Sequence, residues 1–281
     1  MRLPRAWLSG SARSLRPVGE PARAPGGGGA GPAVKAVPNV SNVSNVTDQG
    51  LRFLGAPVHA VLFDLDGTLL DTAGDIALAL RRAFAEQGHD APGTDEVRTM
   101  IGRGAPMLVQ RALAWRGLAL DALAQAALLE GFFHHYGRLQ ELDECAAQPY
   151  PGVREGLQRL GAQRVPMAVV TNKQERFARG LVQRLGLAPW FPLVVGGDTC
   201  ERRKPDPQPL VWACAQLGVQ VAHTVMVGDS VNDVQAARAA GMRVVCVPYG
   251  YNEGTDPRAL PCDAFVQTLQ ELPALLGLRG D

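Results

Sequence analysis

The sequence lacks the features that mark membrane proteins and nucleic-acid-binding proteins. No apolar run approaches the roughly 20 residues that a membrane-spanning helix needs, although 46% of the 281 residues are hydrophobic. The net charge of +1 gives no general reason to expect a nucleic acid or an anionic membrane surface as a partner. The length suits one large domain or two small ones.

The cysteines also lack any pattern of pairing. Their number is odd, and no two of them are spaced as C-x-x-C. The five are Cys145, Cys200, Cys214, Cys246 and Cys262. We therefore expect free thiols in a reducing compartment instead of a disulfide framework or a zinc site. This pattern favours a cytoplasmic protein.

Residues 1–55 differ in composition from the rest of the chain. They are rich in arginine, and Glu20 is the only acidic residue before Asp48. We expect an N-terminal extension that is a disordered tail, upstream sequence from a wrongly chosen start, or an organelle-targeting peptide, since such peptides are rich in Arg and poor in acids. No apolar core typical of a secretory signal is present. The folded part is expected to begin near residue 56.

The stretch VLFDLDGTLLD at residues 61–71 predicts a buried strand that ends in acids. Val61, Leu62 and Phe63 are apolar, and Asp64 and Asp66 follow directly. Such a run suits a central strand of a parallel sheet, and open α/β sheets bind ligands at the carboxyl ends of their strands. Two crowded acids repel each other unless a cation or a shared proton relieves them. The stretch therefore predicts a hard metal ion and carboxylate chemistry.

Strand and helix patterns alternate in the second half of the chain. Expected strands cover residues 167–170, 193–195, 224–227, 243–247 and 265–266, with amphipathic helices between them. This alternation indicates an α/β fold with a doubly wound parallel sheet. We expect the core domain to comprise residues 56–74 and 150–281.

Residues 75–149 show helical patterns only. Asp75 is expected to cap the first helix, on which Ile76, Leu80 and Phe84 share one face. Helices are also expected near residues 96–102, 106–117 and 120–140. A helical insert placed directly after the first strand is expected to form a cap domain over the site.

Polar residues at four places near strand ends form a candidate site. They are Asp64 and Asp66, then Thr171 and Asn172, then Lys204, and finally Asp229 with Asp233 four residues later. Carboxylates that share a cation suit Mg²⁺, which prefers oxygen ligands. Fixed donors and a lysine stabilise charge on a transferring phosphoryl group. The set therefore predicts Mg²⁺-dependent phosphoryl transfer.

Each of these residues has an expected role in that chemistry. Asp64 is the expected nucleophile and forms an aspartyl-phosphate. Asp66 is the expected acid/base, which protonates the leaving oxygen and then activates water. The Thr171 hydroxyl and the Asn172 amide would donate to phosphate oxygens, and Lys204 would supply a positive charge.

Four motifs in this order resemble the haloacid-dehalogenase-like phosphatases. DLDGT at residues 64–68 is similar to their first motif, Thr171-Asn172 to the second, Lys204 to the third, and GDSVND at residues 228–233 to the fourth. The resemblance implies a Rossmann-like core with a small all-helical cap. It also implies that Asp64 and Asp229 are metal ligands, that Asp66 binds the metal through its main-chain carbonyl, and that Asp233 supports the metal site.

Within that family, three stretches resemble the phosphoglycolate phosphatases of bacteria. They are LLDTAGDIALAL, VRTMIGRG and VPYGYNEG. The expected activity is hydrolysis of a small phosphorylated acid, 2-phosphoglycolate, to glycolate and phosphate, by a monomer or homodimer. Alternatives are a phosphatase for N-acetylmuramic acid 6-phosphate or another sugar phosphate, a phosphomutase, and a non-enzymatic phosphate-binding regulatory module. A dehalogenase is disfavoured because it would lack an acid at Asp66.

The Gly102-Arg103-Gly104 sequence in the cap has two interpretations. It is a break between helices, or its amides and Arg103 bind the substrate's carboxylate when the cap closes. Arginine pairs well with carboxylates. Arg103 is therefore a candidate substrate-binding residue.

Overall fold

A six-stranded parallel sheet forms the centre of the computed structural model, which describes residues 50–278. The strand order is β10-β9-β8-β3-β6-β7, and all neighbours are parallel. The strands are β3 (Ala60–Phe63), β6 (Met167–Val170), β7 (Leu193–Val195), β8 (Thr224–Gly228), β9 (Arg243–Cys246) and β10 (Ala264–Phe265). They match the expected strands to within one residue at each end, so the predicted doubly wound α/β fold is confirmed.

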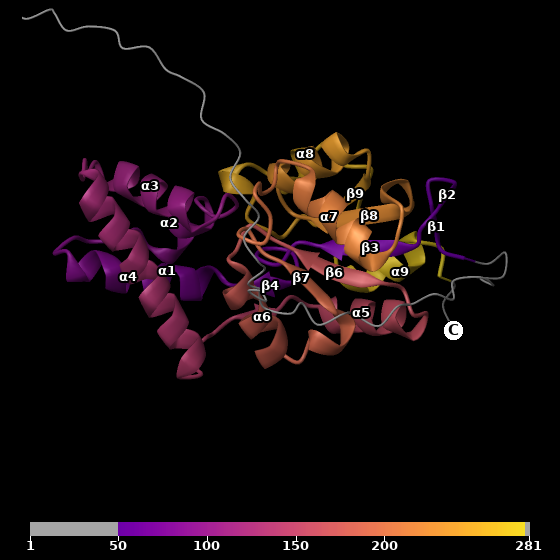
Figure 1. The fold of residues 1–281 in the computed structure, drawn as a ribbon, viewed down its shortest axis with the longest axis horizontal. Helices are drawn as coiled ribbons and strands as arrows, with labels where there is room; N and C mark the ends of the chain where they lie inside the picture. The colour runs from indigo at the N-terminus through magenta and orange to yellow at the C-terminus, as the bar shows by residue number, and fades with distance from the viewer. Residues whose placement is uncertain (1–49, 279–281) are drawn as a thin grey trace, which may run out of the picture. The chain divides into compact units, whose positions relative to one another are not determined.

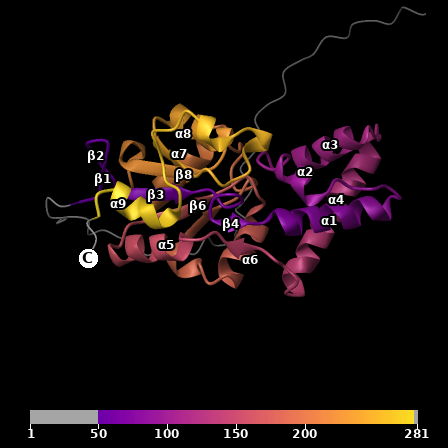
Figure 2. The ribbon, with the colours of Figure 1, turned by 180° about the vertical axis from the view of Figure 1, so that it is seen from behind.

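Helices cover both faces of this sheet. Figure 1 shows α7 (Gln208–Leu217) and α8 (Val231–Ala240) on one side, and α5 (Val153–Ala162) and α6 (Glu175–Arg184) on the other. The view from behind in Figure 2 shows the same layers, with α9 (Leu272–Leu275) on the α5 side. Strand side chains alternate between the faces: Leu62 packs in the cluster of α7 and α8, whereas Val61 and Phe63 pack in the other. Both faces are buried, which explains the continuous apolar runs.

Four helices precede the return to the sheet, and we call residues 73–141 the cap segment. They are α1 (Ala73–Glu86), α2 (Thr94–Arg98), α3 (Ala105–Arg116) and α4 (Ala122–Glu141). Helix α1 packs along α4, and Leu80, Phe84, Leu128 and Phe132 of these helices are buried in one apolar cluster. The helical prediction for this segment is confirmed.

We call the other described residues, 50–72 and 142–278, the sheet domain. Two short strands join the cap segment to this domain. β4 (Leu70–Asp71) pairs antiparallel with β5 (Gln148–Pro149), so the chain enters and leaves the cap segment at adjacent points. The sequence pattern predicted no strand near residue 148. Strands of two residues are too short to show a period of two.

Asp75 has a different role from the one expected. The N-cap of α1 is Thr72, so Asp75 lies inside the first turn and does not cap the helix. Its buried carboxylate accepts hydrogen bonds from the amides of Ala146 (2.7 Å) and Ala147 (3.1 Å). Asp75 therefore fastens α1 to the segment that leads out of the cap.

The prediction that the N-terminal extension continues to residue 55 is wrong for its last residues. β1 (Arg52–Phe53) pairs with β2 (Ala56–Pro57), Phe53 is buried, and the Arg52 amide donates to the Leu276 carbonyl (2.9 Å). This hairpin belongs to the sheet domain, so the folded part begins before residue 56. The remaining extension lies outside the described residues.

Two further sequence expectations concern the cysteines and membrane-spanning helices. All five cysteines are free thiols, as predicted. Among residues 50–278, no helix combines the length and the apolar character needed to cross a membrane.

Replacing Asp75 by Ala tests its role at the cap exit. We expect Asp75→Ala to lower the free energy of unfolding by about 1–3 kcal/mol, because two main-chain amides lose their acceptor. Urea titration followed by circular dichroism measures this change. The control is Asp90→Ala, which removes an exposed partner of Arg116 and should cost under about 1 kcal/mol. Equal losses in the two variants would contradict the role of Asp75.

Candidate active site

The candidate site lies where three neighbouring strands end. Phe63 at the end of β3 is in register with Val227 of β8 and Val169 of β6. Asp64, Asp229 and Thr171 each follow one of these strands within two residues. The sheet therefore brings them to one edge, as the sequence predicted.

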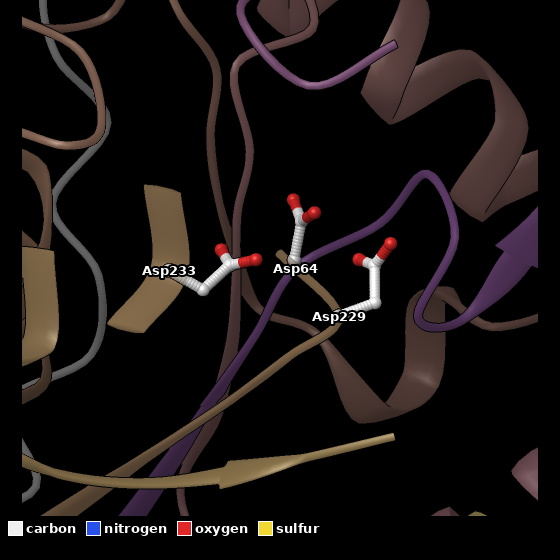
Figure 3. A group of neighbouring side chains, drawn as sticks. All are labelled: Asp64, Asp229 and Asp233. Carbon is white, nitrogen blue, oxygen red and sulfur yellow. The ribbon is translucent and has the colours of Figure 1, made fainter. Parts of the chain in front are cut away.

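Three buried carboxylates meet at this edge. Figure 3 shows Asp64 between Asp233 and Asp229, with the carboxylate of Asp233 directed toward Asp64. One carboxylate oxygen from each lies within 4.8 Å of the other two, and the residues are 8%, 1% and 0% exposed. Three like charges at this spacing and depth need positive charge nearby.

Lys204 supplies one positive charge to this cluster. Its ammonium lies 2.6 Å from Asp233 Oδ1 and 2.9 Å from Asp64 Oδ1, and it donates to the Val170 carbonyl (2.6 Å). Burial opposes the charged form, but Asp233 and Asp64 outweigh it and raise the pKa of Lys204. Asp233 also forms a capping box with Ser230 at the start of α8. Asp233 is therefore held by Lys204 and by its own helix.

One ammonium does not balance three carboxylates. Burial raises the pKa of Asp64, and the contact with Lys204 offsets this only in part. Burial also raises the pKa of Asp229, and the charges of Asp64 and Asp233 add to the effect. Asp64 Oδ1 is buried and has no aligned hydrogen bond, so its contact with Lys204 is a charge contact. An oxygen-rich cluster with excess negative charge fits a hard cation such as Mg²⁺.

Asp229 is fixed on both carboxylate oxygens. The Thr68 hydroxyl donates to Oδ1 (2.8 Å), and the Tyr251 amide donates to Oδ2 (2.7 Å). A Cβ added at Gly67 or Gly250 would collide with this carboxylate. Two glycines therefore let the main chain close around Asp229 and fix its direction.

Asp66 lies apart from the three-carboxylate cluster. Its Oδ1 accepts from the Thr72 hydroxyl (2.7 Å) and from Lys173 Nζ (3.0 Å), which is also 3.2 Å from Oδ2. Its side chain is 12% exposed. The carboxylate faces a cavity beneath the cap segment, and its expected metal contact through the main chain stays a prediction.

Lys173 is a site residue to which the sequence analysis assigned no role. Its side chain is 8% exposed, and its ammonium lies 4.5 Å from the centre of the Tyr136 ring on cap helix α4. The Tyr136 hydroxyl has no aligned partner, so a cation–π contact joins the two. Burial opposes the charged form, but Asp66 and Tyr136 raise the pKa of Lys173. Lys173 therefore connects Asp66 to the cap segment.

The cavity lies between these residues and the cap segment. The sheet domain contributes Asp64, Asp66, Thr171, Asn172 and Lys173 to its lining. The cap segment contributes Ile101, Gly102, Gly104, Leu108, Phe132 and Tyr136, among others. The walls are thus charged at the strand ends and mostly apolar under the cap.

Two predicted substrate-binding residues have other partners here. The Asn172 amide donates to the carbonyls of Gly102 and Lys204, both at 2.9 Å. Arg103 is not among the cavity-lining residues: its Nε donates to Glu253 (3.0 Å), and its side chain is 45% exposed. Arg103 as a direct ligand of the substrate stays a prediction.

Comparisons with known proteins agree with this geometry. The model of the haloacid dehalogenase-like hydrolases matches residues 61–247. A phosphoglycolate phosphatase of Thiobacillus denitrificans is 44% identical over 219 residues, which cover 76% of this chain and 94% of that protein. One of Nitrosospira multiformis is 44% identical over 221 residues, with 78% and 96% covered.

Solved structures show the same arrangement. The crystal structure of a predicted phosphoglycolate phosphatase from Haemophilus somnus superposes with a TM-score of 0.73 at 30% identity. The match covers 78% of this chain and 97% of that one.

Replacing Lys173 by Met tests its contact with Asp66. We expect Lys173→Met to lower the free energy of unfolding by about 2–3 kcal/mol, because a largely buried carboxylate loses its cation. Urea titration provides the measurement. The control Arg82→Met breaks an exposed pair with Glu144 and should cost under about 1 kcal/mol. A loss no larger than that of the control would show that Lys173 does not hold Asp66.

Proposed function

The chain belongs to the haloacid dehalogenase-like hydrolase family, and we propose that it hydrolyses 2-phosphoglycolate to glycolate and phosphate. The relatives named as phosphoglycolate phosphatases, which the alignments cover almost completely, support this substrate. The observation that carries the proposal is the buried Asp64 beside Lys204, at the floor of a small cavity that Asp66 also lines.

Asp64 and Asp66 have different roles in the reaction. An Asp64 oxygen attacks phosphorus, the bond from phosphorus to the glycolate oxygen breaks, and Asp66 donates its proton to that oxygen. Asp66 then takes a proton from water, which attacks the aspartyl-phosphate and releases phosphate. The separation of Asp66 from the buried cluster supports this division of roles, because only Asp66 pairs with Lys173 at the cap side.

Mg²⁺ is the proposed cofactor. The Asp64 and Asp229 carboxylates and the Asp66 main-chain carbonyl would hold it, and Asp233 would support the site from behind through Lys204. The ion supplies positive charge to the phosphoryl oxygens when bound. Lys204, Thr171 and Asn172 are the proposed phosphate-binding residues.

The size and lining of the cavity support a small substrate. Apolar side chains of the cap segment, Leu108 and Phe132 among them, close it above the strand ends. Few polar groups remain there for the hydroxyl groups of a sugar ring. We also propose a cytoplasmic location, supported by the five free thiols, and a monomeric or homodimeric state.

A substrate panel tests the proposed activity. The panel contains 2-phosphoglycolate, N-acetylmuramic acid 6-phosphate and several sugar phosphates, and activity is measured by phosphate release. We expect kcat/KM to be highest for 2-phosphoglycolate. Asp64→Asn should lower kcat at least about 10⁴-fold, because the nucleophile is lost, while thermal unfolding shows that it still folds. A sugar phosphate as the best substrate would overturn the assignment, and an active Asp64→Asn would overturn the mechanism.

Removal of the metal tests the cofactor. We expect EDTA to abolish phosphate release and added Mg²⁺ to restore it, because the carboxylate cluster then regains its missing positive charge. Mg²⁺ should also raise the unfolding temperature of the wild type, since an ion that binds only the folded state stabilises it. Asp229→Asn should show a smaller rise. Full activity in EDTA would contradict the magnesium assignment.

A further inference from the structure

Glu253 lies where the cap segment meets the sheet domain. It belongs to residues 249–254, which follow β9 and which we call the bridging loop. Its carboxylate accepts from Arg103 Nε (3.0 Å), from Arg111 Nη2 and from Asn232 Nδ2 (2.9 Å). Two of these donors belong to the cap segment, and Asn232 lies on α8 beside the carboxylate cluster.

We propose that Glu253 is a positioning residue that clasps Arg103 and Arg111 and thereby sets the cap segment over the cavity for catalysis. This inference rests on the proposed phosphatase function. It also changes the role of Arg103, which acts through Glu253 and does not itself bind the substrate.

The main chain at Glu253 supports a specific role. Its φ of +51° lies in the left-handed region, which non-glycine residues adopt only when their surroundings require it. The preceding Asn252, also at positive φ, accepts from the Val231 amide (3.0 Å) and donates to the Thr255 carbonyl (3.1 Å). These bonds hold the loop in a conformation that aims Glu253 at the cap segment.

The cap side is shaped to receive Glu253. Gly102 has a φ of +139°, and a Cβ there would lie 3.2 Å from Glu253 Oε1 and 3.2 Å from Asn232 Nδ2. Glycine therefore permits the close approach. Arg111 also donates to the Met100 carbonyl (2.9 Å). It therefore binds both Glu253 and the segment that precedes Gly102.

Glu253 remains charged in this setting. Burial disfavours the carboxylate, but hydrogen bonds from Asn232, Arg111 and Arg103 outweigh it and lower the pKa of Glu253. Its side chain is 15% exposed, against 25% for Arg111. Partly buried pairs of this kind are less screened by salt than exposed ones.

The bridging loop also holds the proposed metal ligand. The Tyr251 amide donates to Asp229, and its hydroxyl accepts from the amides of Thr72 and Ala73 and donates to Asp71. The loop thus contacts the carboxylate cluster, the entry to the cap segment and the cap arginines. A change in the clasp is expected to move the residues of the cap that line the cavity.

Glu253→Gln separates the clasp from a direct role of Arg103. The glutamine keeps the shape and loses the charge. If Arg103 bound the substrate's carboxylate, its release from Glu253 would lower KM. If the clasp sets the cap, KM for 2-phosphoglycolate should rise and kcat/KM should fall about tenfold, because small misplacements of positioning groups are costly.

A double-mutant cycle makes the distinction quantitative. We expect Arg103→Gln to lower kcat/KM less than Glu253→Gln does, because Arg111 still pairs with Glu253 in that variant. The double variant should be no worse than Glu253→Gln alone, because the contact with Arg103 is already lost there. Hydrolysis of p-nitrophenyl phosphate, which has no carboxylate to place, should change less than about threefold. A lower KM in Glu253→Gln, or fully additive effects, would overturn the clasp.

A second readout needs no substrate. Hydrogen exchange of the amides at residues 99–105 should be at least about tenfold faster in Glu253→Gln, with β3 and β8 unchanged, because the clasp protects that segment from opening. The control Glu86→Gln breaks the pair with His135, which lies entirely within the cap segment, and should leave residues 99–105 unchanged. Wild-type exchange in Glu253→Gln would overturn the clasp. Absence of 2-phosphoglycolate hydrolysis by the wild type would instead overturn the proposed function alone.

Discussion

The arrangement of the site depends on the ion pairs of the buried Lys204 ammonium with Asp64 and Asp233. Lys204 is 2% exposed and lies between Asp64 at the end of β3 and Asp233 at the start of α8. Two carboxylates buried this deeply would carry a large desolvation cost without a cation between them. The bond from Lys204 to the Val170 carbonyl adds the end of β6 to the same group. One side chain thus joins three elements and fixes the direction of the proposed nucleophile.

A second lysine separates the two acids of the opening motif. Asp64 and Asp66 stand two residues apart, yet Asp64 faces Lys204 and the carboxylate cluster, whereas Asp66 faces Lys173 and the cap segment. Their positive partners differ, and so do the charges around them. Lys173 also lies over the Tyr136 ring of α4, so it links the proposed acid/base residue to a helix of the cap segment. The difference in roles follows from this difference in partners.

Much of the fold could be predicted because its signals are local. Continuous apolar runs mark β3, β6 and β8, and the polar residues directly after them, Asp64, Thr171 and Asp229, mark the edge where the site forms. The hairpin of β1 and β2 and the pair of β4 and β5 have two residues per strand and carry no such signal. The contact between Arg103 and Glu253 spans 150 positions of sequence, and nothing near either residue indicates the other. The sequence contained one indication that Lys173 belongs to the site. Only three of the 28 Lys and Arg residues are lysines, and Lys173 directly follows Thr171 and Asn172.

The bridging loop connects the carboxylate cluster to the cap segment. Tyr251 contacts Asp229 with its amide and the start of α1 with its hydroxyl, while Glu253, two residues later, contacts Arg103 and Arg111. The loop is also anchored through Asn252, which accepts from the Val231 amide of α8, the helix that carries Asp233. The cap segment and the carboxylate cluster therefore contact the same loop. If Glu253 positions the cap segment as proposed, a substitution in α3 that displaces Arg111 would act on the cavity through Glu253, even though Arg111 lies outside the cavity lining.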